Sequence, residues 1–60
     1  MCTPTYARNE VLRILNTDMT AREMLNELLG LPADVFNADR RYCLAAVERV
    51  EEMIAIIEGA

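Results

Sequence analysis

The 60-residue chain contains no histidine, serine, lysine, glutamine or tryptophan. Without histidine and serine, the Ser–His and Cys–His pairs that activate nucleophiles cannot be assembled. Without lysine, neither a lysine Schiff base nor a phosphate-binding P-loop can form. A chain this short also has little material left for a substrate pocket once it has built a core. The sequence therefore predicts a protein that is not an enzyme and has no small-molecule substrate.

Cysteine is scarce as well, with Cys2 and Cys43 as the two examples. Secreted mini-proteins typically carry about four to eight cysteines, and zinc sites draw on cysteine and histidine together. Cys43 lies inside an apolar helical pattern, which is typical of a buried thiol. We therefore expect no metal, no cofactor and a reducing, cytoplasmic location.

Long apolar runs are also missing, since the longest are residues 42–47 and 53–57. Both are far too short to cross a bilayer, and the first residues do not resemble a signal peptide. The chain has six basic residues, all arginine, and ten acidic residues, which gives a net charge of −4. Such a balance opposes broad attraction to nucleic acid or anionic lipid, so we expect no membrane partner.

Hydrophobic residues make up 53% of the chain, and their spacing predicts three helices in one domain spanning residues 1–60. The first covers about 4–15, with Thr3 as its N-cap and Pro4 at its first position. The second covers 21–29. Thr20 and Glu23 have the spacing of a capping box before it, and Gly30 is a candidate left-handed stop after it.

The third predicted helix is long. It begins at residue 34 or 38, capped by Asp34 or Asn37, and ends at residue 58 before Gly59. The first two helices together match its length, so the simplest architecture packs both of them on it. The predicted fold class is therefore all-α, with two short helices against one long C-terminal helix.

This long helix carries more apolar surface than packing on one side requires, because an apolar stripe little wider than about 100° suffices for that. A domain of this size also gains from self-association. We therefore predict a homodimeric helical bundle. The expected dimer interface is Val47, Val50, Met53, Ile54 and Ile57.

A helix-turn-helix unit is an alternative interpretation of residues 20–43. A capped helix, a glycine turn and a second helix over residues 33–43 would set two helices at a steep angle. Asn37, Arg40 and Arg41 would then reach base edges or phosphates. Asn26 stands where such units usually place a small residue, and Asp39 where they place an apolar one, so nucleic acid is the less favoured partner.

The favoured interpretation is a small acidic module that binds another protein and inhibits or regulates it, as small phage or bacterial proteins do. A structural subunit of a larger assembly is a further alternative. The acidic strip near the C-terminus includes Glu48 and Glu52, like charges four residues apart, which slightly destabilise an isolated helix. That local cost points to a use such as docking onto a basic protein surface, although a solvated face that keeps the protein soluble is the favoured interpretation of the strip. The candidate partner-binding residues are Asn37, Arg40, Arg41, Glu48, Glu51 and Glu52.

Overall fold

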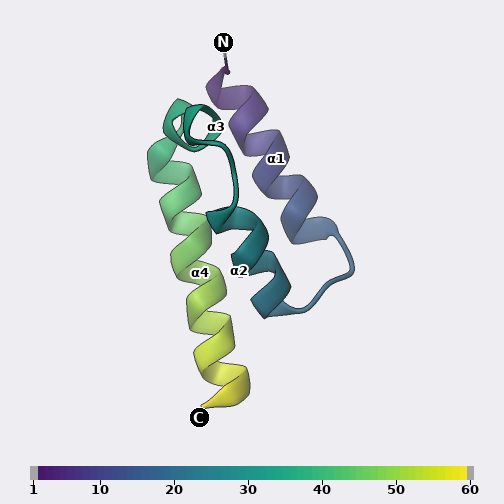
Figure 1. Cartoon of the computed structure of the whole chain (residues 1–60). Helices are drawn as coiled ribbons and strands as arrows, with labels where there is room; N and C mark the ends of the chain where they lie inside the picture. Colours follow the sequence, from purple (N-terminus) through teal and green to yellow (C-terminus); the bar gives the residue numbers. More distant parts are fainter. Residues whose placement is uncertain (1, 60) are drawn as a thin grey trace.

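The computed structural model describes residues 2–59, and every regular element among them is a helix. The chain runs through α1 (Pro4–Asn16), α2 (Ala21–Leu29), α3 (Ala33–Ala38) and α4 (Arg40–Glu58). α1 and α2 lie on one side of α4, and the short α3 crosses near the N-terminal end of α4 (Figure 1). The predicted all-α class is confirmed.

Side-chain caps at two helix starts agree with the sequence patterns. Thr3 caps α1 by accepting a hydrogen bond from the backbone N–H of Tyr6 at 3.1 Å, and Pro4 occupies the first turn. Before α2, the Thr20 hydroxyl accepts from the N–H of Glu23, and the Glu23 carboxylate accepts from the N–H of Thr20, both at 3.2 Å. This reciprocal arrangement is the predicted capping box.

The long C-terminal helix is confirmed as α4, but a start at residue 34 is wrong, because Asp39 separates α4 from the short α3, which was not predicted. Asp39 leaves the helical conformation, with φ −147° and ψ 71°, and its carboxylate accepts from the N–H of Tyr42 at 3.3 Å. Short carboxylate side chains compete for backbone N–H groups in this way and favour caps over helix interiors. Neither Asp34 nor Asn37 caps a helix; α3 follows Pro32 without a side-chain cap.

The turn after α2 also differs from its prediction. Gly30 has φ −88°, a right-handed conformation that any residue can adopt. Its N–H donates to the carbonyl of Asn26 at 2.9 Å, and the N–H of Leu31 donates to the carbonyl of Leu28. These two bonds satisfy helix-end carbonyls without a left-handed residue, so the expected left-handed stop at Gly30 is wrong.

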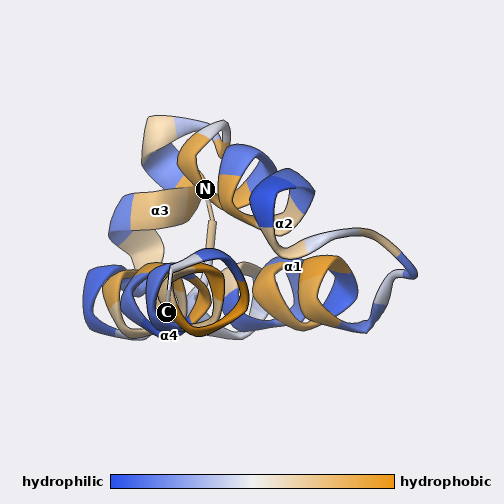
Figure 2. Ribbon diagram, turned by 90° about the horizontal axis from the view of Figure 1, so that it is seen from below, coloured by the Kyte–Doolittle hydropathy of each residue, from blue (hydrophilic) through white to orange (hydrophobic). Residues whose placement is uncertain are grey.

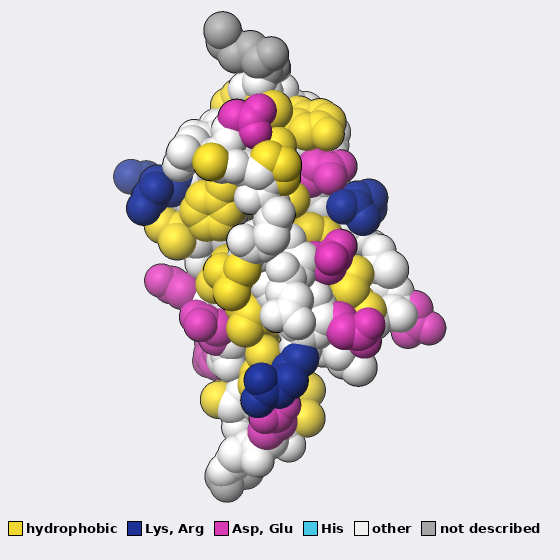
Figure 3. Space-filling model, viewed as in Figure 1, with side chains coloured by type: hydrophobic (Ala, Val, Ile, Leu, Met, Phe, Trp, Pro, Cys, Tyr) yellow, Lys and Arg dark blue, Asp and Glu magenta, His cyan; other side chains and the backbone are white. Residues whose placement is uncertain are grey.

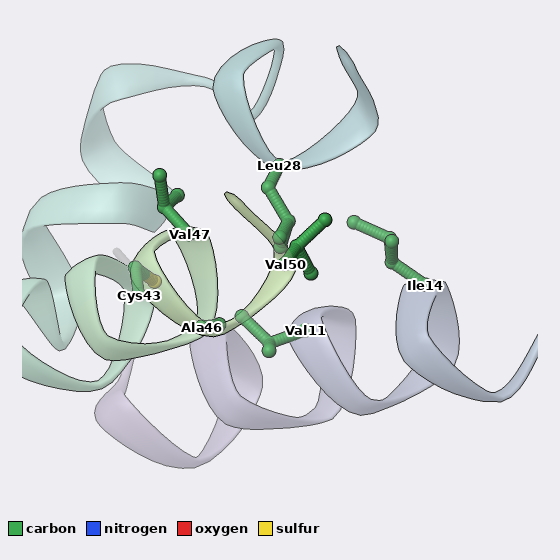
Figure 4. Close-up of a cluster of buried hydrophobic side chains, with 7 residues drawn as sticks. All are labelled: Val11, Ile14, Leu28, Cys43, Ala46, Val47 and Val50. Atoms are coloured by element: carbon green, nitrogen blue, oxygen red, sulfur yellow. The ribbon is translucent and has the colours of Figure 1, made fainter. Parts of the chain in front are cut away.

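The core is small and consists of aliphatic side chains and one cysteine. It joins the inner faces of α1, α2 and α4, whose side chains point toward one another (Figure 4). Burying a valine, leucine or isoleucine fully contributes about 1.5–3 kcal/mol. The buried cluster consists of Val11, Ile14, Leu28, Cys43, Ala46, Val47 and Val50.

α4 is the amphipathic spine of the molecule. Viewed from its C-terminal end, its hydrophobic parts face α1 and α2 and its hydrophilic parts face outward (Figure 2). At about 1.5 Å per residue its 19 residues extend roughly 28 Å, well beyond the end of α1. Among the described residues, no helix is long and apolar enough to cross a membrane.

Candidate functional site

The last two turns of α4 expose a hydrophobic surface, which we call the C-terminal apolar surface. It comprises Met53, Ile54, Ile56 and Ile57. Ile56 is 69% exposed, Ile57 70% and Met53 39%, while Ile54 is partly buried against the core. The last turns of α4 extend past the end of α1 (Figure 1).

The five predicted dimer-interface residues divide between two environments. Val47 and Val50 are buried in the core of the single chain, packed with α1 and α2, and so are withdrawn from any surface contact. Met53, Ile54 and Ile57 lie on the C-terminal apolar surface. Ile56 is as exposed as Ile57 but was absent from the predicted interface, although it follows Met53 at helical spacing.

A hollow of about 480 Å³ lies between this surface and the start of α2. Ala21, Ile54 and Ile57 give it an apolar lining, and Arg22 and Glu58 close one side. The Nε of Arg22 donates to the Glu58 carboxylate at 2.6 Å, and a second guanidinium nitrogen donates to the other oxygen. At the lower end of the molecule, a basic and an acidic side chain lie together between hydrophobic ones (Figure 3).

This bidentate pair fixes the charge state of Glu58. Hydrogen bonding from Arg22 lowers the pKa of the Glu58 carboxyl, so the carboxylate stays ionised over a wider pH range. Glu58 is therefore already engaged within the chain, unlike three other glutamates of α4. Glu48, Glu51 and Glu52 are exposed and form no ion pair with other described residues.

A second surface, which we call the Arg40 face, lies at the opposite end of α4. It comprises Leu29, Phe36, Asn37, Arg40, Arg41 and Leu44. Two shallow hollows meet at Arg40: one of about 360 Å³ contains Leu29, Phe36 and Asn37, and one of about 520 Å³ contains Arg41 and Leu44. Leu29 is 63% exposed and Leu44 40%.

The structure thus brings four predicted partner-binding residues together. Asn37, Arg40, Arg41 and Glu48 line these two joined hollows, and the Asn37 amide oxygen accepts a hydrogen bond from Arg40 at 3.3 Å. Glu51 and Glu52 lie further along α4 and line neither hollow. Leu29 and Leu44 were not predicted to take part, because their exposure depends on where α2 and α4 meet their neighbours.

The arginines fall into two groups. Arg8, Arg13 and Arg22 each pair with a carboxylate, at Asp39, Glu10 and Glu58 respectively. The other three, Arg40, Arg41 and Arg49, all lie on α4 and form no ion pair within the described part of the chain. Two of these three stand in the first turn of α4, where the helix dipole disfavours positive charge.

Neither thiol is arranged for chemistry. Cys43 is buried in the core, and desolvation raises the pKa of its thiol. Cys2 donates to the Asp34 carboxylate at 3.3 Å, and this hydrogen bond raises the pKa of the Cys2 thiol. Because the thiolate is the reactive form, both environments reduce nucleophilicity. The described residues hold no cluster of three or more potential metal ligands.

Comparison with protein-family models, with curated protein sequences and with solved structures found no match.

Proposed function

We propose that this protein is a non-enzymatic protein-interaction module that pairs with a second copy of itself through the C-terminal apolar surface. The observation that carries this proposal is the exposure of Ile56 and Ile57, at 69% and 70%, beside the half-exposed Met53. These three side chains are adjacent on the last turns of α4, so a partner can cover them together.

Burial of the exposed isoleucines would stabilise the protein. Covering one isoleucine fully contributes about 1.5–3 kcal/mol, so the exposed parts of Ile56 and Ile57 leave about 2–4 kcal/mol unused in the isolated chain. A 60-residue domain is itself only marginally stable, since it buries only about 60% of the surface that its unfolded chain exposes, less than a larger domain does. A second copy supplies a surface of equal hydrophobicity. In a symmetric homodimer the exposed isoleucines of both copies are covered at once, so the stabilisation is obtained for each chain.

The dimer interface is tested with Ile57→Asp, because Ile57 is exposed and contributes little to the core. We expect this variant to sediment as a folded monomer in analytical ultracentrifugation while the wild type sediments as a dimer. Leu12→Asp is the matched control: Leu12 is 44% exposed on α1 and lies outside the proposed interface. Dimers of Ile57→Asp as stable as the wild type would refute this interface.

The homodimer then acts on another protein, as an inhibitor or regulator. This part of the proposal draws support from the reactive residue types that the sequence lacks and from the second exposed surface around Arg40. Affinity capture from the source cell with mass spectrometry tests it. A conditional complex supports a regulator, whereas a permanent stoichiometric complex indicates a structural subunit.

Nucleic acid stays the less favoured partner. That alternative required one recognition helix over residues 33–43, but Asp39 interrupts the helix there. The six-residue α3 is short for reading a groove, and Asp34 stands in its first turn. The remaining support for DNA binding is the pair of exposed arginines, Arg40 and Arg41.

A further inference from the structure

We infer that the Arg40 face docks an acidic amphipathic helix of another protein, and this inference rests on the proposed role as a protein-binding module. The face alternates in character along its length. Leu29 and Phe36 line one hollow, Arg41, Leu44 and Glu48 line the other, and Arg40 borders both. A complementary helix presents a carboxylate between apolar side chains about one turn away on either side.

Half of the six arginines are paired within the chain. The chain has more acidic than basic residues, and three arginines already have carboxylate partners. Arg40 and Arg41 nevertheless form no ion pair with any described residue. Asp39, the nearest carboxylate in sequence, accepts hydrogen bonds from Arg8 and from the N–H of Tyr42, and its interaction with Arg41 is electrostatic without a direct ion pair.

Two guanidinium groups thus lie exposed at a position that the helix dipole disfavours. A carboxylate from a partner offsets that cost, and guanidinium groups bind carboxylates in bidentate geometry. The apolar components of the face determine what else the partner carries. Leu29 is 63% exposed and lies beside Phe36 in the hollow that Arg40 borders. Leu44 lies one turn after Arg40 in the second hollow.

A purely electrostatic ligand such as a phosphate backbone would leave both leucines in water. A helix with leucines flanking a glutamate covers the leucines and neutralises the arginines together.

The Arg40 face is separate from the proposed dimer interface. Arg40 and Ile56 stand 16 residues apart on the same helix, which corresponds to about 24 Å. Both surfaces can therefore be occupied at once, and a dimer presents two Arg40 faces. Avidity for a partner with two docking helices follows from this arrangement.

The test uses fluorescence anisotropy with a designed helical peptide of about 18 residues, long enough to be helical in isolation. One version carries glutamates between its leucines, and a matched version carries lysines at the same positions. The wild type is expected to bind the glutamate peptide and not the lysine peptide. The double variant Arg40→Glu with Arg41→Glu should lose roughly tenfold or more in affinity for the glutamate peptide and bind the lysine peptide instead.

Arg49→Glu is the control, since Arg49 lies on the same helix, forms no ion pair with a described residue and borders neither hollow. It should bind the glutamate peptide within about twofold of the wild type. Equal binding of both peptides by the wild type, or no effect of the double variant, would overturn the inference.

Binding of a labelled DNA duplex distinguishes nucleic acid, the alternative partner, from the acidic helix. If the duplex binds with steep salt dependence through Arg40 and Arg41 while the glutamate peptide does not bind, the face is a nucleic-acid site and the inference fails. Circular dichroism verifies that the double variant is folded. The sedimentation mass of the wild type keeps the two proposals distinct, because a wild type that dimerises but does not bind the glutamate peptide refutes only the Arg40 face.

Discussion

Leu28 and Leu29 are neighbours in α2 with opposite environments, and they give a direct test of the core. Leu28 is fully buried between α1 and α4, and it is the buried residue of α2. Leu29 is 63% exposed. Replacing each by alanine removes the same atoms and leaves the local helix propensity nearly unchanged, because leucine and alanine are both good helix formers.

The expected magnitudes differ several-fold. Leu→Ala at a fully buried site removes about 2–5 kcal/mol, because lost transfer free energy and a residual cavity add. Exposed substitutions usually change stability by about 0.5 kcal/mol or less. At about 0.05–0.15 kcal/mol per residue, 60 residues have a total stability of roughly 3–9 kcal/mol. Leu28→Ala therefore removes a large share of the whole stability of the chain.

Urea titration followed by far-ultraviolet circular dichroism measures both variants, at one fixed protein concentration because dimerisation adds to apparent stability. Leu28→Ala should be largely unfolded or have a much lower midpoint, and Leu29→Ala should resemble the wild type. A loss of less than about 1 kcal/mol for Leu28→Ala would show that α2 is not packed on α4 in the way described.

Three further predictions concern a cap, a titrating pair and the thiols. Thr20→Ala removes one half of the capping box and should destabilise the fold by about 1 kcal/mol in the same urea titration; an unchanged midpoint would contradict the cap. Hydrogen bonding from Arg8 lowers the pKa of Asp39, so this group stabilises the fold at pH values above its unfolded pKa, and the contribution is lost as pH falls through the lowered folded pKa. Asp39→Asn should therefore flatten the acid limb of a stability–pH profile, and an unaltered acid limb would count against the pair. Cys2 should react with a thiol reagent in the folded protein, whereas Cys43 should react only as the chain unfolds; equal rates would contradict the burial of Cys43.

Local signals in the sequence were the reliable ones. Thr3 with Pro4, and Thr20 with Glu23, act within a single turn of helix, so neighbouring residues alone determine these caps. The break at Asp39 was missed because an apolar repeat continues across it, from Phe36 to Cys43. The carboxylate that ends one helix there caps the next, and it is also held by Arg8, 31 residues earlier in the chain.

From the sequence, the exposed hydrophobic residues of α4 could be distinguished only in part from the buried ones. The excess of hydrophobic residues over a single packing stripe correctly indicated that some would stay exposed. The sequence could not place the boundary, because that depends on where α1 ends beside α4. Val50 therefore lies in the core while Ile57, two turns later, lies at the surface. The Arg22–Glu58 pair joins positions 36 residues apart and carried no local signal.

The central claim is that the end of α4 is covered by a second copy. Multi-angle light scattering of the purified wild-type protein across a range of concentrations measures this most directly. The account predicts a species of twice the chain mass of 6.8 kDa, dissociating only on dilution. A folded protein that keeps the mass of a single chain at the highest concentrations, with Ile56 and Ile57 left in water, would contradict it.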